Sequence, residues 1–127
     1  MWFSRRAGWL LAGIGLIHCC IGLLLSWDIF VAWQSNGWWH SIESAHGLRM
    51  DRFAALWFQV SGFSWVLLGW LMQQWLNRTG ALPQGLGWAL VAMGLLVAWV
   101  LPLSGAWLFL PVGLLVARPS NPAAQWA

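Results

Sequence analysis

The sequence has very little charge of either sign and contains no Lys and no Tyr. Its only acidic residues are Asp28, Glu43 and Asp51. Charged residues make up 7% of the chain, whereas a soluble globular protein has about 25%. So few charged side chains cannot form a water-facing surface on a chain that is 61% hydrophobic. We therefore expect lipid, and not water, to surround most of this protein.

The net positive charge reflects the shortage of acids and does not indicate a basic patch. Six arginines give a net charge of +3, but they are scattered along the chain instead of lining one face. We therefore expect no nucleic acid among the partners. The arginines are Arg5, Arg6, Arg49, Arg52, Arg78 and Arg118.

Signatures of catalysis and of a disulfide framework are also missing. The two cysteines, Cys19 and Cys20, are neighbours, and a bridge between neighbours on a helix would be strained. The sequence shows no phosphate-binding glycine loop, no nucleophile with an obvious base and no paired carboxylates at hydrolase spacing. We therefore expect a protein that is not an enzyme.

What the sequence does contain is long apolar runs, of which the first covers residues 8–33. As an α-helix it would be about 39 Å long, against about 30 Å for the hydrocarbon core of a bilayer. Small residues recur in it at alternating spacings of four and three, which places them on one stripe of a helix. In lipid, such a stripe lets two helices approach backbone to backbone. The stripe consists of Gly8, Ala12, Gly15, Cys19, Gly22 and Ser26.

A second apolar stretch, residues 53–76, is expected to pack against the first. Its small residues Ala55, Gly62 and Gly69 repeat at a spacing of seven, so they form a stripe of their own. Asp51 is suited to cap the N-terminus of this helix.

Two shorter stretches, residues 83–101 and 103–117, are separated by a turn that begins at Pro102. Gly87 and Gly94 again repeat at a spacing of seven. The last stretch would be only about 22 Å long, so it would need a locally thin bilayer or a turn below the headgroups. Together the four stretches predict an all-α integral membrane protein, a single-domain antiparallel four-helix bundle.

The arginines predict the orientation. With four crossings, the outer segment 34–52 lies on one side and the tail 118–127 on the other. By the positive-inside rule, we expect both termini to be cytoplasmic, which in a bacterium corresponds to the cytoplasmic (inner) membrane. In the alternative with three crossings, residues 83–117 form one kinked helix of about 50 Å, which is too long for one crossing. The cytoplasmic set would be Arg5, Arg6, Arg78 and Arg118, with Arg49 and Arg52 opposite.

Three motifs carry a resemblance to a known family: RFAALWFQVSG at residues 52–62, LPQGLGW at 82–88 and PLSGAW at 102–107. With them, the chain from His18 onward resembles a bacterial family of small four-span membrane proteins that is catalogued only as a domain of unknown function. The resemblance implies a fold and a topology. It implies no catalytic or cofactor-binding residue.

His18 falls near the centre of the first span, where a titratable side chain usually faces other protein groups. A neutral imidazole there can bond to a backbone carbonyl or to Ser61 or Ser64 of the second span. The alternative is a cofactor role as a haem ligand, which would require a symmetric dimer to supply a second histidine.

Asp28 lies toward the outer end of the first span and would be costly to expose to lipid. Arg49 or Arg52 is its expected ion-pair partner. The alternative is a carboxylate site for a cation or a proton.

His40, Glu43 and His46 follow one another at spacings of three, a combination of ligands that suits divalent metals. On an ideal helix the three drift about 60° per step, so they converge only in a 3₁₀ or irregular segment. A solvated surface cluster is the alternative.

The leading functional expectation is a non-enzymatic accessory or scaffolding subunit of a homo-oligomer or larger membrane complex, with lipid as a further ligand. One alternative is a small transporter or hydrophobic-ligand binder that uses Asp28 and segment 34–52. The other is a haem or metal protein that uses His18 or the His40, Glu43 and His46 set. We expect the helix contacts to rest on Gly15, Cys19, Gly22, Gly62, Gly69 and Gly94.

Overall fold

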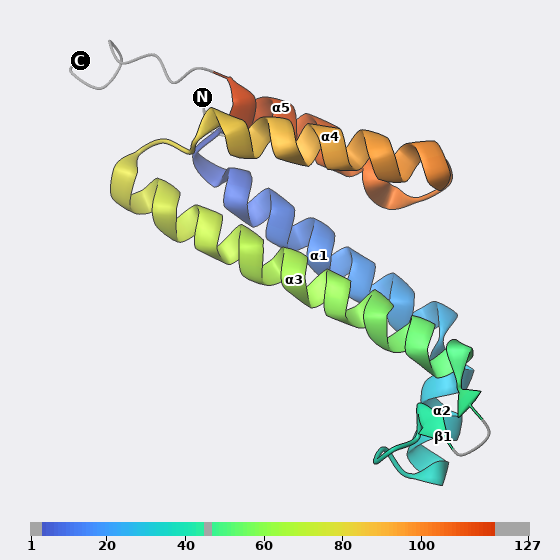
Figure 1. Cartoon of the computed structure of the whole chain (residues 1–127). Helices are drawn as coiled ribbons and strands as arrows, with labels where there is room; N and C mark the ends of the chain where they lie inside the picture. Colours follow the sequence, from blue (N-terminus) through green and yellow to red (C-terminus); the bar gives the residue numbers. More distant parts are fainter. Residues whose placement is uncertain (1–3, 45–46, 119–127) are drawn as a thin grey trace, which may run out of the picture. The chain divides into compact units, whose positions relative to one another are not determined.

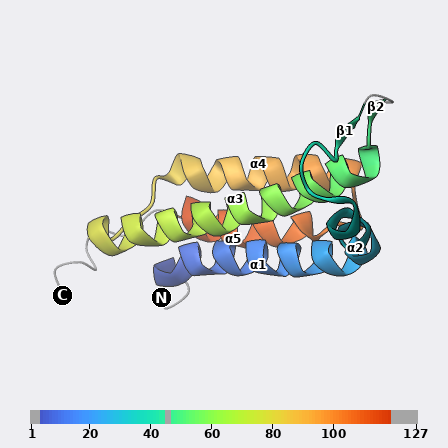
Figure 2. The same cartoon turned by 90° about the horizontal axis from the view of Figure 1, so that it is seen from below.

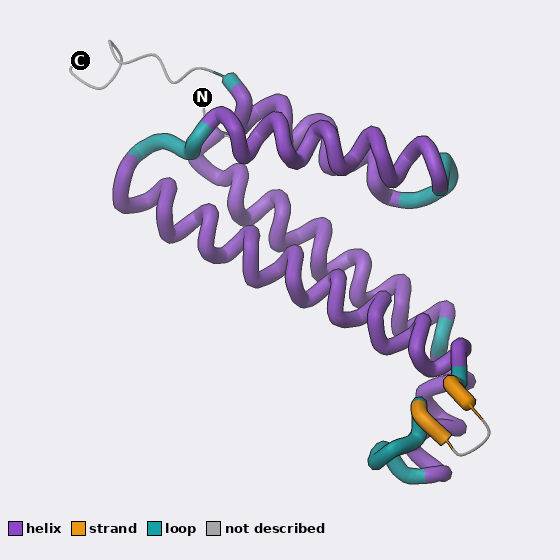
Figure 3. The backbone as a smooth tube through the Cα atoms, viewed as in Figure 1, coloured by secondary structure: helices purple, strands orange, loops and turns teal. Residues whose placement is uncertain are grey.

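The computed structural model describes residues 4–44 and 47–118, and these are almost entirely helical (Figure 3). The all-α prediction is therefore confirmed for the described residues. In chain order the elements are the 3₁₀ helix η1 (Ser4–Arg6), α1 (Ala7–Leu25), α2 (Trp27–Asn36), β1 (Glu43–Ser44), β2 (Gly47–Leu48), α3 (Met50–Thr79), α4 (Gln84–Val100), the 3₁₀ helix η2 (Gly105–Leu108) and α5 (Phe109–Ala117).

Two of these helices, α1 and α3, are long and apolar enough to cross a membrane, judged by length and composition. Helix α4 and the η2–α5 segment are apolar but shorter. At about 1.5 Å per residue, α4 is about 26 Å long, so it falls short of a hydrocarbon core of about 30 Å. A membrane bundle of four full crossings is thus not confirmed.

The chain divides into two compact units, which are described separately. One unit comprises residues 13–66 and holds most of α1, all of α2, the strand pair and the first half of α3. The other comprises residues 1–12 and 67–127 and holds the start of α1, the second half of α3, α4 and α5.

In the unit of residues 13–66, α1 packs against α3 with backbone close to backbone (Figure 1). A Cβ atom added to Gly15 would lie 2.7 Å from the carbonyl oxygen of Gly62, and one added to Gly22 would lie 2.5 Å from the Phe58 ring. Helices approach this closely only where no side chain intervenes. The two predicted stripes therefore contact each other here.

The unit of residues 1–12 and 67–127 shows the same kind of contact at the first turns of α1. A Cβ atom added to Gly8 would lie 2.5 Å from the carbonyl oxygen of Gly69, and one added to Gly69 would collide with the amide nitrogen of Ala12. The predicted small-residue spacing thus fits the observed register of the two helices.

Helices α4 and α5 of this unit form an antiparallel hairpin (Figure 1). A Cβ atom added to Gly113 would lie 2.8 Å from the carbonyl oxygen of Gly87, and one added to Gly94 would lie 3.0 Å from the Cβ atom of Phe109. Between them the chain turns at Pro102, as predicted. This turn excludes the alternative in which the last two stretches form one kinked helix.

The predicted first span, residues 8–33, differs from the structure because two helices share it. Helix α1 ends before Ser26, whose dihedral angles of φ −112° and ψ 18° are not helical. The hydrogen bonds continue across the break, since Ser26 N donates to Gly22 O at 3.0 Å and Phe30 N donates to Ser26 O at 3.0 Å. A single non-helical residue therefore separates α2 from α1 without unwinding the chain.

The start of α3 also differs from prediction. Phe53 N donates to Arg49 O at 2.9 Å, which places Asp51 inside the first turn and not at the N-cap. The helix begins at Met50, three residues before the predicted 53–76 stretch. Antiparallel strands β1 and β2 lead into it, at the N-terminal end of α3 (Figure 2).

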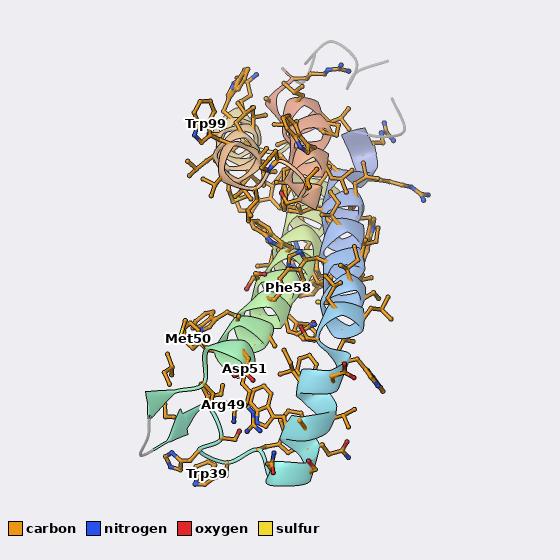
Figure 4. All side chains as sticks on the ribbon, turned by 90° about the vertical axis from the view of Figure 1, so that its right-hand side faces the viewer. Trp39, Arg49, Met50, Asp51, Phe58 and Trp99 are labelled. Atoms are coloured by element: carbon orange, nitrogen blue, oxygen red, sulfur yellow. The ribbon has the colours of Figure 1, made fainter. Side chains whose placement is uncertain are left out.

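Large apolar side chains cover the outside of these helices. Leu24 is 78% exposed, Trp99 is 87% exposed and Leu103 is fully exposed. Figure 4 shows Trp99 pointing away from its helix. Among the described residues, the buried positions are mostly small or medium-sized: Ala7, Leu11, Ala12, Cys19, Ala55, Met72, Leu90, Ala98, Ala106 and Val112 are examples.

Candidate functional site

A cavity of about 260 Å³ lies where the strand pair meets the first turns of α3, within the unit of residues 13–66. It is open on one side, and most of its walls are apolar. The lining residues are Trp38, His40, Ser41, Ile42, Glu43, Leu48, Phe53, Leu56 and Trp57.

Aromatic rings form a large part of the walls. On α3, the rings of Phe53 and Trp57 are 6.1 Å apart and meet edge to face. The Trp38 ring packs against the ring of Trp33, and the two ring centroids are 4.9 Å apart. Trp33 itself is buried, and its indole nitrogen has no hydrogen-bond partner among the described residues. Trp38 therefore rests on a packed base formed by α2, although its own ring is half exposed.

His40 and Glu43 are the titratable residues in the cavity wall. His40 has a φ of 50°, a left-handed conformation that is uncommon for a residue other than glycine. Its ring lies edge-on to Trp39, with centroids 5.0 Å apart. The structure thus brings two of the three predicted metal ligands to one cavity, while His46 lies outside the described residues. Among the described residues no set of three metal-ligating side chains is found.

Neither of the two arginines predicted to pair with Asp28 bonds to it in the structure. Arg49 donates to the carboxylate of Asp51, with 3.0 Å between Nη2 and Oδ2 (Figure 4). Arg52 is buried, and its Nη1 donates to the carbonyl oxygen of Ser41 at 3.0 Å. Asp28 is exposed on the first turn of α2, and within residues 4–44 and 47–118 it forms no ion pair.

The Arg52 contact has a structural consequence for the cavity. Arg52 belongs to the α3 face that is turned inward, so its guanidinium holds the segment before β1 against that helix. Ser41 also donates its hydroxyl to the carbonyl oxygen of Trp38 at 2.9 Å. The turn that carries Trp38 and His40 is therefore tied both to itself and to α3.

His18 has the protein partners expected of a structural histidine. Its Nε2 lies 3.1 Å from the carbonyl oxygen of Phe58 and 3.0 Å from Oγ of Ser61, and its ring stacks on that of Phe58 at 3.9 Å. Ser64 instead donates to Val60 O. Because both neighbours lie at Nε2, this nitrogen is not free to ligate a haem iron in the observed conformation.

Two buried glutamines of α3 bond to the backbone of α1, and the sequence interpretation did not single them out. Gln59 Nε2 donates to the carbonyl oxygen of Cys19 at 3.2 Å. Gln73 Nε2 donates to the carbonyl oxygen of Arg5 at 2.9 Å, and its Oε1 accepts from the amide of Trp9 at 3.4 Å. The signal was present, because both glutamines and Arg52 lie on the same helical stripe as Ala55, Gly62 and Gly69.

The predicted helix-packing residues do lie at close contacts. The Cys19 sulfur is the nearest atom to a Cβ added at Gly62, and Cys19 also donates to the carbonyl oxygen of Gln59 at 3.8 Å. Gly113 is a further contact residue on α5 that its single occurrence in a short apolar stretch did not reveal. The predicted residues at these contacts are Gly15, Cys19, Gly22, Gly62, Gly69 and Gly94.

Comparison with known proteins finds one family. The model of a family described as a family of unknown function (DUF6463) matches residues 3–122. No curated protein matches the chain. No solved structure matches it.

Proposed function

The chain belongs to this family of unknown function, and from its own contacts we propose that it is a non-enzymatic integral membrane protein, a helical subunit of a homo-oligomer or larger membrane complex. The observation that carries the proposal is the inversion of side-chain size. Glycine and alanine fill the helix contacts, while leucine and tryptophan cover the exposed faces. This distribution suits helices in lipid, where close backbone packing, and not burial of large side chains, holds helices together.

The exposed faces are too apolar for a chain in water. Leu24 and Leu25 at the end of α1 are 78% and 77% exposed, and Val100 and Leu101 at the end of α4 are 68% and 58% exposed. A soluble monomer rarely exposes contiguous apolar patches of more than a few hundred Å². In a membrane the same faces contact acyl chains at no cost.

The small size of the chain supports a role as a subunit. A chain of 127 residues has a large surface for its volume, so its helices leave broad faces available to another chain. The small-residue contacts hold α1 and α3 in one register, which suits a scaffold more than a moving part. Lipid is a further ligand for the exposed faces.

The arginine distribution supports an orientation with both termini in the cytoplasm of a bacterial cell. Gln73 of α3 bonds to the backbone of Arg5, so the start of α1 lies beside the end of α3, near Arg78. The contact of Gly87 with Ala117 likewise places the start of α4 beside the end of α5, near Arg118. By the positive-inside rule these ends face the cytoplasm.

Native mass spectrometry of the gently extracted full chain tests the proposal. We expect the protein in the membrane fraction after a carbonate wash, released by detergent, and in a spectrum that shows a dimer or higher oligomer or a bound partner chain. Recovery from the soluble fraction would disprove the membrane assignment. A stable monomer without any partner in several mild detergents would disprove the subunit role.

A further inference from the structure

We propose that the cavity between the strand pair and the first turns of α3 binds an organic ammonium group, held between the carboxylate of Glu43 and the rings of Trp38, Phe53 and Trp57. All four residues line the same cavity of about 260 Å³. This proposal goes beyond the subunit role, and it does not depend on that role being correct.

The charge of the cavity favours a cation. Among residues 4–44 and 47–118, Glu43 forms no ion pair, and neither of the two arginines of this region bonds to it. Arg49 bonds to Asp51, and Arg52 donates to the carbonyl oxygen of Ser41. The residues that line the cavity therefore include one carboxylate, that of Glu43, and no arginine.

The walls favour an organic cation over a hydrated metal ion. Aromatic rings attract a cation to their faces, and they also provide apolar contact for its methyl groups. The Phe53 and Trp57 rings lie 6.1 Å apart on adjacent turns of α3, and Trp38 is fixed in place by Trp33. A strongly hydrated cation would gain little from such walls, whereas a methylated ammonium loses little hydration on entering them.

The size and the backbone geometry agree with a small ligand. The cavity is slightly smaller than the range of about 300–1,000 Å³ that is usual for drug-sized ligands, so it suits a headgroup-sized molecule. His40 holds a left-handed backbone conformation in its wall. Unusual backbone conformations of this kind cluster at ligand sites, where surrounding contacts maintain them.

The ammonium group can come from a free solute or from a lipid headgroup, since the cavity lies at the N-terminal end of the apolar helix α3. Choline is a suitable soluble probe because its nine equivalent methyl protons give one sharp NMR signal. Its neutral tert-butyl analogue, in which carbon replaces nitrogen, has the same shape without the charge. The two compounds therefore separate charge recognition from apolar contact.

Saturation-transfer NMR on the full chain in a maltoside detergent measures the binding of both probes. We expect saturable binding of choline. The affinity for the neutral analogue should be lower by a factor of about five at least. Glu43→Gln should weaken choline binding about fivefold, and Trp57→Leu should do so by a similar factor. Asp28→Asn and Trp99→Leu, which remove a carboxylate and an exposed indole outside the cavity, should leave it unchanged.

Equal binding of the two probes would overturn the proposal, as would a Glu43→Gln variant that binds choline as well as Asp28→Asn does.

A measurement in nanodiscs distinguishes the two sources of the ammonium group. Choline binding in phosphatidylglycerol nanodiscs that disappears in phosphatidylcholine nanodiscs assigns the lipid headgroup, and binding in both assigns a free solute. Absence of choline binding in both kinds of nanodisc would contradict the proposal.

Discussion

At the residue scale, glycine determines where the helices touch. The stripe containing Gly15 could be predicted because small residues at spacings of three and four fall on one side of a helix whatever surrounds it. Gly13, which lies off that stripe, has nothing within 4 Å of an added Cβ atom. The sequence pattern therefore distinguishes contact glycines from non-contact glycines on the same helix.

This distinction predicts opposite effects for two matched substitutions. Gly15→Ala should destabilise the protein by about 1–3 kcal/mol, because the added methyl group would lie 2.7 Å from backbone atoms of α3. Gly13→Ala should be neutral or stabilise the protein by up to about 1 kcal/mol, since alanine favours the helix and meets no neighbour. Reversible unfolding in detergent, followed by circular dichroism, measures both. Equal free energies of unfolding for the two variants would refute the close contact at Gly15.

Polar side chains were harder to predict than glycines. The partner of Arg49 is Asp51, two residues away, and the partner of Arg52 is the carbonyl oxygen of Ser41. Both depend on how the irregular segment before α3 folds, and no periodic pattern describes such a segment. The sequence singled out His40 and Glu43 of the cavity but not its aromatic residues, because Trp38 and Trp57 come to line one cavity only through that fold.

At the element scale, periodicity identified the helices well and their ends less well. The turn at Pro102 was predictable because proline cannot continue a helix. The break at Ser26 was not, since serine tolerates helical geometry and the hydrogen bonds on either side persist. The cap at the start of α1 could not be predicted either, because it comes from Gln73, which is distant in the sequence.

Gln73 of α3 caps the N-terminal end of α1, and this role can be tested by substitution. Its amide accepts from the Trp9 amide, one of the first N–H groups of the helix, and donates to the carbonyl oxygen of Arg5. Gln73→Leu should cost about 1–2 kcal/mol and speed hydrogen exchange in the first turn of α1. The neighbouring substitution Gln74→Leu, at a half-exposed position, is the matched control. Exchange rates in this turn that are the same in both variants would refute the capping role.

At the scale of the whole molecule, the contacts of α1 with α3 and of α4 with α5 make two antiparallel hairpins. An antiparallel hairpin returns the chain to the side from which it started. In the proposed topology, we therefore expect both hairpins to open toward the side that carries the loop between α3 and α4, whether or not the α4–α5 hairpin crosses the bilayer fully. This is why the distribution of arginines predicts the orientation more readily than the number of full crossings.

Cysteine labelling in right-side-out membrane vesicles tests this orientation and the depth of the second hairpin. In a background without Cys19 and Cys20, we expect a membrane-impermeant maleimide to react with Ser35→Cys, on the side that the proposed topology assigns to the outside. It should react with Ala81→Cys only after the vesicles are opened. Ser104→Cys should react only after detergent is added, because α4, at about 26 Å, ends below the far headgroups. Labelling of Ala81→Cys in sealed vesicles would reverse the orientation. Labelling of Ser104→Cys from outside would instead mean that the turn at Pro102 reaches the far surface and that the α4–α5 hairpin crosses completely.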